Sequence, residues 1–182
     1  MRKITVISFL SLLICSCVTT NRPARDTREP TFLMKIKGDG LDEEITEDFD
    51  FDNQALYLRR NATYQILFTI NDAGGLKSAA WEYPLQTINP GDLRAARGLI
   101  ATSNSGDPNR EQQSWSPVNF NDDVYSSNLI STNRLVAIGG PLDGTVQNFD
   151  WEIEVIDMNN NTTRRTLIYR VTNDPSRIGS RD

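Results

Sequence analysis

The sequence contains no histidine, and its only two cysteines, Cys15 and Cys17, both lie near the amino terminus. Without histidine, the commonest general base of enzymes and the imidazole metal ligands are excluded. A disulfide framework in the body of the chain is excluded as well, because it needs pairs of cysteines there. A pair of carboxylates, as in glycosidases, is the remaining catalytic route, and nothing singles out two of the 24 acidic residues. We therefore expect no enzyme.

Positive charge is also in short supply. The chain has 19 Lys and Arg against 24 Asp and Glu, a formal net charge of −5, and loss of Arg2 and Lys3 with an N-terminal leader would make it −7. Nucleic-acid binding depends on Lys and Arg that neutralise phosphates, so we expect no nucleic-acid partner. Without residues 1–16, 166 of the 182 residues remain, which is enough for one domain, or at most two small ones, with a real core.

The amino terminus has the layout of a secretory signal. Arg2 and Lys3 precede an almost unbroken apolar run over 4–14, and small residues follow it. Such a run is too short to cross a bilayer, which takes about 20 apolar residues. An ordinary secretory signal, cut nearby and with two incidental cysteines, is one interpretation.

The tetrapeptide Ile14-Cys15-Ser16-Cys17 gives the other interpretation, because it resembles the lipobox of bacterial lipoproteins. Ile14 stands at the aliphatic position, Ser16 at the small position and Cys17 at the cysteine that takes diacylglycerol. Cys15 fits badly, since bulky Ile14 would then stand just before the cut. The resemblance implies that residues 1–16 are a lipoprotein signal peptide and that Cys17 carries the covalent lipid.

The same resemblance implies a membrane anchor in a bacterial cell envelope. Val18 and Thr19 follow the cysteine where an Asp would favour the inner membrane, so we expect the outer membrane. Residues 17–30 are polar, contain two prolines and show no apolar period, which predicts a flexible tether behind the lipidated cysteine. We expect a single domain over 31–174 and a frayed tail over 175–182.

Strand periodicity dominates the body of the chain. Apolar and polar residues alternate, and β-branched and aromatic residues are frequent, which predicts an antiparallel β-sandwich. Leu93, Ala96 and Leu99 have helical spacing, so one short helix or a turn is expected in the middle region. Residues 104–127 are polar and loop-like, and because so long a loop is unusual in a compact domain, we expect that the segment is functional or hides short strands. The predicted strands lie in 31–37, 55–60, 63–72, 76–84, 131–140, 147–157 and 163–174.

An acidic run over 38–54 contains eight carboxylates and raises the question of calcium. Asp48, Asp50 and Asp52 match the first three EF-hand ligands, but Asn53 replaces the glycine and Arg59 the closing glutamate. We therefore predict that 48–52 is a solvated strand with its acids outward and its phenylalanines inward, and we do not favour calcium there.

Two segments share one plan, in which a strand is followed by Asp, a Gly- or Asn-rich turn and a second strand. They are TYQILFTINDAGGLKSAAWEY (63–83) and NFDWEIEVIDMNNNTTRRTLIYRV (148–171), and each reads as a hairpin. The plan resembles bacterial immunoglobulin-like and cadherin-like sandwiches, which implies that fold. In cadherin-like repeats an Asp at such a turn can hold calcium, which makes Asp72 and Asp157 weak metal candidates. We expect instead that both bond their own turn amides, without a metal or other cofactor.

These observations favour a non-catalytic binding or structural module with a protein or glycan ligand. Trp81 and Trp151 lie on inward strand faces, whereas Trp115 lies in the polar loop and is the best candidate for an exposed ligand platform. One alternative is a periplasmic assembly or accessory factor that binds a partner chain through a strand edge. The other is a carboxylate-based glycan hydrolase.

Overall fold

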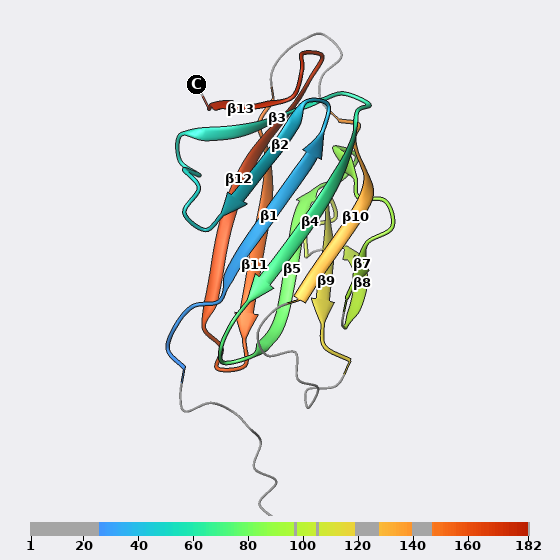
Figure 1. Cartoon of the computed structure of the whole chain (residues 1–182). Helices are drawn as coiled ribbons and strands as arrows, with labels where there is room; N and C mark the ends of the chain where they lie inside the picture. The colour runs from blue at the N-terminus through green and yellow to red at the C-terminus, as the bar shows by residue number, and fades with distance from the viewer. Residues whose placement is uncertain (1–25, 97, 105, 119–127, 140–146, 182) are drawn as a thin grey trace, which may run out of the picture.

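The computed structural model describes residues 26–96, 98–104, 106–118, 128–139 and 147–181. Its secondary structure is entirely β, and two sheets pack face to face (Figure 1). The predicted all-β, immunoglobulin-like sandwich is confirmed. Within the described residues, no helix has the length and apolar character needed to cross a membrane.

Sheet A has the strand order β2-β1-β4-β10-β6, and β7 also pairs with β10. All its neighbours run antiparallel, and β10 carries a register shift between Thr132 and Leu135 where it pairs with β4. The strands of sheet A are β1 (Thr31–Gly38), β2 (Leu41–Thr46), β4 (Thr63–Asn71), β6 (Ile88–Asn89), β7 (Arg94–Ala95) and β10 (Asn128–Ala137).

Sheet B has the strand order β13-β3-β12-β11-β5-β9-β8. Its neighbours are antiparallel except β3 and β12, which run parallel, so the prediction of a purely antiparallel sandwich is wrong at this pair. The strands of sheet B are β3 (Gln54–Arg59), β5 (Leu76–Pro84), β8 (Leu99–Asn104), β9 (Arg110–Ser116), β11 (Phe149–Asp157), β12 (Thr162–Thr172) and β13 (Arg177–Ser180).

The core lies between the sheets because alternate residues of each strand point inward. Along β4 and β11, buried and more exposed positions alternate over the whole strand, as the sequence predicts. Aromatic rings meet there: the ring centroids of Phe68 in sheet A and Trp81 in sheet B are 5.0 Å apart, and those of Trp151 and Tyr169, both in sheet B, are 6.1 Å apart. Such aromatic pairs add about 0.5–1.5 kcal/mol each beyond the area they bury.

The first of the two predicted hairpins is not a hairpin. Strand β4 belongs to sheet A and β5 to sheet B, so the turn at 72–75 crosses from one sheet to the other, whereas β11 and β12 pair directly. The difference has a physical reason: both strands of 63–83 present their apolar side chains to the same core. Two strands can bury their apolar faces in one core either by pairing within a sheet or by lying in two facing sheets, so the pattern does not distinguish these arrangements.

The predicted helix in the middle region is wrong. Residues 88–104 form β6, β7 and β8, joined by short links. Gly91 and Gly98 have φ angles of +64° and +96°, which no helix accommodates, and Leu93 instead lines a cavity between the sheets. Within the polar segment 104–127, residues 110–116 form β9, so the alternative that this segment hides a short strand is confirmed.

The predicted strand at 48–52 is a turn instead. Asp50 accepts a hydrogen bond from the Asn53 amide at 3.2 Å, which is typical of a turn-forming Asp. Phe49 and Phe51 are partly buried against the core with ring centroids 5.1 Å apart, while the acids stay exposed. The prediction that the phenylalanines point inward and the acids outward is therefore confirmed, although the segment is not a strand.

The carboxyl-terminal segment is paired rather than frayed. Strand β13 adds to the edge of β3, and the Arg181 amide donates to the Asn53 carbonyl at 2.9 Å. Buried Arg170 holds this corner together. It donates to Asn148 Oδ1 at 2.6 Å, to the Tyr57 hydroxyl and to the Arg181 carbonyl, and its guanidinium lies 5.2 Å from the Tyr57 ring centroid. The prediction of a frayed tail is thus wrong for 177–181.

A second group of hydrogen bonds joins segments that lie far apart in the sequence. The Tyr64 hydroxyl accepts a hydrogen bond from the Arg59 amide at 2.8 Å, five residues upstream, which is the same kind of contact as the tyrosine corner of Greek-key sandwiches. The same hydroxyl lies 2.6 Å from Ser176 Oγ, and Asp39 accepts from the amide and the hydroxyl of Ser176 at 3.0 and 2.7 Å. The β1–β2 turn, the start of β4 and the approach to β13 therefore form one hydrogen-bonded corner.

The Arg170 contacts give a first prediction. Arg170→Met should lower the free energy of unfolding by about 2–3 kcal/mol, because it removes three hydrogen bonds and leaves their acceptors without a donor. Urea denaturation measures the loss, and amide exchange should show that protection disappears first in β13. Arg164→Met is the matched control: Arg164 is largely exposed and paired with one carboxylate, so it should cost at most about 1 kcal/mol. Equal losses in the two variants would contradict the role given to Arg170.

Candidate functional site

The three tryptophans lie in the core. Trp81 is 4% exposed, Trp151 3% and Trp115 0%. The expectation that Trp115 is an exposed platform is therefore wrong. Trp115 is an inward residue of β9, and Gly98 on the neighbouring chain segment leaves room for its indole, since a Cβ atom at position 98 would collide with it. The burial of Trp115 could not be recognised from the sequence, because the other residues of 110–116 are polar on both faces of the strand.

Asp72 and Asp157 lie side by side at one end of the sandwich. Asp72 Oδ1 accepts from the Gly74 amide at 2.6 Å. Asp157 Oδ1 accepts from the amides of Asn159 and Asn161 at 2.8 and 2.6 Å. Both carboxylates thus bond their own turn amides, as expected from the sequence. In the part of the chain that the structure describes, no group of three or more His, Cys, Asp or Glu is placed to hold a metal ion.

The same end of the sandwich receives the amino-terminal segment (Figure 1). The Asp26 carbonyl accepts a hydrogen bond from Asn161 Nδ2 at 3.0 Å, and the carbonyl of buried Pro30 accepts one from Thr163 Oγ1. Residues 26–30, predicted to belong to the tether, therefore rest on the domain. Cys17 and residues 17–25 lie outside the described residues.

Burial of Asp72 raises its pKa from 3.8 to about 6, and the nearby carboxylates of Asp157 and Asp26 act in the same direction. Hydrogen bonds from the turn amides oppose this rise without cancelling it. Asp72 is consequently a carboxyl group whose charge the folded protein disfavours at neutral pH.

An ion-pair network covers the outer face of sheet B. Arg110 reaches Glu82 at 2.5 Å, Asp150 at 2.7 Å and Glu152 at 3.4 Å, so one guanidinium joins β9, β5 and β11. Glu82 and Glu152 are directly opposite in register, and Arg110 offsets the repulsion between them. A shallow depression of about 50 Å³ lies beside this network, lined by Ala80, Glu82, Gln112, Glu152, Glu154 and Arg164.

This depression is where the structure brings carboxylates together. Glu154 pairs with Arg164, and Glu82 and Glu152 pair with Arg110. Paired carboxylates on an open sheet face form a structural network, whereas a glycosidase places its two carboxyl groups on either side of a bound sugar. Sequence reasoning missed Arg110, because its partners are 28 to 42 residues away along the chain.

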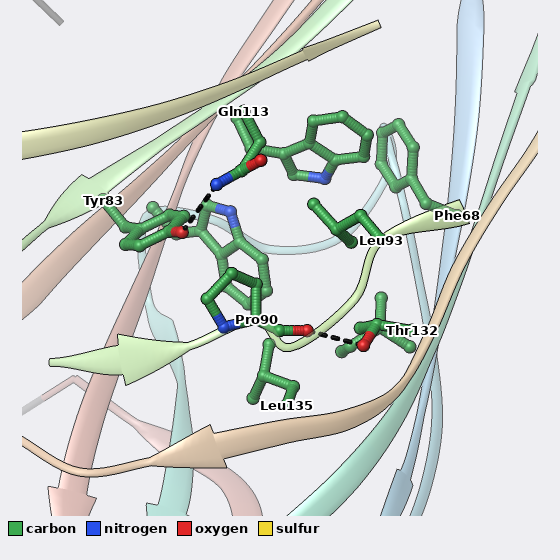
Figure 2. Close-up of a pocket in the computed structure, with 10 residues that line it drawn as sticks. Phe68, Tyr83, Pro90, Leu93, Gln113, Thr132 and Leu135 are labelled. Carbon is green, nitrogen blue, oxygen red and sulfur yellow. Dashed lines mark hydrogen bonds between the residues drawn. The ribbon is translucent and has the colours of Figure 1, made fainter. Parts of the chain in front are cut away.

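A cavity of about 20 Å³ lies between the two sheets, under the link from β6 to β7 (Figure 2). Its walls are mostly apolar and aromatic. Gln113 Nε2 lies 3.4 Å from the Tyr83 hydroxyl, and Thr132 Oγ1 donates to the Pro90 carbonyl at 2.5 Å. The lining residues are Ile66, Phe68, Trp81, Tyr83, Pro90, Leu93, Gln113, Thr132, Leu135 and Trp151.

The edges of the two sheets differ in how they are protected. Edge strands need protection because their unpaired backbone groups can pair with another chain. Strand β2 carries three consecutive acids, Asp42, Glu43 and Glu44. Strand β13 has four residues and includes Arg177, whose guanidinium lies 4.2 Å from the Tyr57 ring centroid. The outer side of β10 is covered over short stretches by β6 and β7.

Strand β8 lacks these protections. Its six residues, LIATSN, contain no charge and no proline, and it is the last strand of sheet B. Leu99 is 60% exposed, and Ala101, Thr102 and Ser103 are exposed too. On its inner side β8 is well anchored, with β9 in register over its whole length and Thr102 Oγ1 donating to Gln113 Oε1 at 2.7 Å. The described part of the chain therefore presents one long, ordered and uncharged edge.

Comparisons with known proteins find weak structural similarities and no match in sequence. No protein-family model matches the chain, and a search of curated protein sequences finds no match. Among solved structures, the chain is similar to BcpA, the major pilin subunit of Bacillus cereus, with 12% identity and a TM-score of 0.45 over 80% of this chain and 41% of the pilin. It is also similar to the C-terminal domain of the Streptococcus agalactiae AgI/II polypeptide BspA, with 13% identity and a TM-score of 0.48 over 79% of this chain and 49% of that one.

A third similarity is to a cohesin module from a Clostridium perfringens family 33 glycoside hydrolase. The identity is 11% and the TM-score 0.41, over 66% of this chain and 96% of the module. The chain spans less than half of the pilin and streptococcal chains that it matches.

The raised pKa of Asp72 gives a second prediction. Between pH 3.8 and about 6 the folded state binds a proton more tightly than the unfolded state, so this group lowers stability as the pH rises through that window. Asp72→Asn keeps an acceptor for the turn amide but removes the charge. It should raise the free energy of unfolding by about 1–2 kcal/mol at pH 7.5 and leave it nearly unchanged at pH 4.

Chemical denaturation of both proteins at the two pH values measures this difference. A gain of equal size at both pH values, or a loss at pH 7.5, would show that the carboxylate of Asp72 is not disfavoured by the fold.

Proposed function

We propose that this chain is a lipid-anchored, non-catalytic module of the cell envelope that binds an extended segment of a partner protein along β8. The observation that carries the proposal is the free edge of β8, which is long, paired in register on its other side and without charge. An added strand gains main-chain hydrogen bonds along such an edge, and the side chains on its two faces provide specificity. The absence of the usual protective charges means that the edge is suited to pairing rather than shielded from it.

The side chains around β8 fit such a partner. Leu99, Ala101 and Ser103 face the outer side of sheet B, while Ile100 and Thr102 face the side of the core. All are small or apolar, so an added strand would meet no buried charge on either face. A complementary segment is therefore one that alternates small and apolar residues over about five or six positions.

A glycan ligand finds less support. Sugar sites commonly use exposed aromatic rings, and within the described residues every Trp and Tyr is buried. The aromatic side chains that the sequence offered as a platform are used by the core. A protein ligand is thus the better interpretation of the two that the sequence left open.

The anchor gives the module an orientation. If Cys17 carries the lipid, the contacts of Asp26 and Pro30 support an orientation in which the turns at 72–75 and 157–161 face the membrane. Nine residues, 17–25, would then link the lipid to the domain, with a mean reach of about 15–18 Å as a coil. Val18 and Thr19 after the cysteine favour the outer membrane as the site of the anchor.

The lipid anchor gives a third prediction. Cells that produce the protein and grow with radiolabelled palmitate should label the wild type and Cys15→Ala but not Cys17→Ala, because only Cys17 has a small residue just before it. Gel fluorography after immunoprecipitation reads the label. Label that persists in Cys17→Ala and disappears in Cys15→Ala would mean that the other cysteine is modified.

The edge of β8 gives a fourth prediction. A photoreactive benzoylphenylalanine at Ala101 should form a discrete adduct of higher mass in intact cells, because a bound strand would lie beside it. The same residue placed at Gln65, an exposed position in the middle of sheet A, is the matched control and should form none. Ser103→Lys should reduce the Ala101 adduct at least tenfold, because a charge on the edge opposes pairing.

Mass spectrometry of the adduct identifies the crosslinked residues of the partner. Equal crosslinking from positions 101 and 65, or an adduct that Ser103→Lys leaves unchanged, would rule out recognition through the β8 edge.

A further inference from the structure

The cavity between the sheets contains an unsatisfied polar group. Trp151 lines the cavity and is 3% exposed, and its Nε1 is the one buried side-chain nitrogen or oxygen of the described residues without a hydrogen-bond partner. A buried donor without an acceptor loses the hydrogen bond that it makes to water in the unfolded chain, so native proteins rarely leave one. The geometry of this cavity therefore calls for an acceptor beside Trp151.

The protein groups that line the cavity do not supply that acceptor directly, but they can hold a molecule that does. The Tyr83 hydroxyl donates to Glu111 at 2.6 Å and lies 3.4 Å from Gln113 Nε2, which leaves it able to accept one more hydrogen. The Pro90 carbonyl accepts one hydrogen bond, from Thr132 Oγ1, and has a second lone pair. Tyr83 and Pro90, which Figure 2 labels, line the same cavity as Trp151.

The size of the cavity limits what can bind. A volume of about 20 Å³ exceeds the roughly 10–15 Å³ that one water molecule needs, and it is far smaller than the hydrophobic cavities that bind organic molecules. The ring centroids of Tyr83 and Trp151 lie 6.4 Å apart in an edge-to-face arrangement, and both residues line this cavity.

We propose that this cavity is a binding site for one ordered water, which accepts a hydrogen bond from Trp151 Nε1 and donates to the Tyr83 hydroxyl and the Pro90 carbonyl. Three bonds are typical of buried waters in proteins. The water would join β11 and β5 of sheet B to the link between β6 and β7. That link is flanked on each side by a strand of only two residues. The water would add a hydrogen-bonded contact between the link and sheet B.

Nuclear magnetic resonance of the whole protein tests the proposal. A water-selective, ¹⁵N-edited exchange experiment should show a direct cross-peak between bound water and the Trp151 indole hydrogen, assigned with Trp151→Phe. Trp115 is the internal control, because its side chain is fully buried and already has a partner, so its indole hydrogen should show no such peak. Absence of the Trp151 cross-peak under conditions that detect other buried waters would overturn the proposal.

A second measurement separates a hydrated cavity from a dry one. Benzothienylalanine has the shape of tryptophan without its N–H, and at position 151 it removes only the donor. With a bound water, the substitution should lower the melting temperature by several degrees, because the water loses a bond. In a dry cavity it removes an unsatisfied donor, and an unchanged or higher melting temperature would contradict the water site.

Discussion

The contact between aromatic side chains of the two facing sheets is the interaction on which the rest of this structure depends. Phe68 from sheet A meets Trp81 from sheet B, and Trp151 packs against Tyr83 and Tyr169 within the same core. Because these large rings fill the space between the sheets, every Trp and Tyr of the described residues is buried, whereas aliphatic side chains such as Leu99 and Val118 remain exposed.

At the surface, the edge strands of the two sheets differ in whether their unpaired backbone groups are protected. Three acids protect β2, and the Arg170 contacts fasten β13 against β3. Arg110 pairs with Glu82, Asp150 and Glu152 on the outer face of sheet B. Strand β8 stands apart, since it is ordered by β9 on one side and carries no protective charge. Binding by strand addition is the use of a sheet edge that fits this contrast.

Local alternation was enough to predict the sandwich and much of its core. Strands with a clean apolar face, such as β4 and β11, were predicted from the sequence because burial on one side imposes a period of two. The assignment of strands to sheets was not predictable, because pairing such as that of β3 with β12 joins residues more than a hundred positions apart. The turn amides bonded by Asp72 and Asp157 were predictable, since those contacts are local.

The proposed binding edge, β8, was not predictable for the same physical reason. Residues 89–103 have no strong period, and β8 becomes an edge only because β9 pairs with it and with β5. Trp115 sits among polar neighbours, so its burial depends on Gly98 and on the opposite sheet rather than on its own segment. Amide exchange over residues 99–104 tests the central claim most directly, in the purified domain and in native membranes. Protection of the β8 amides should increase at least tenfold in membranes, and equal exchange rates in both samples would contradict strand addition at β8.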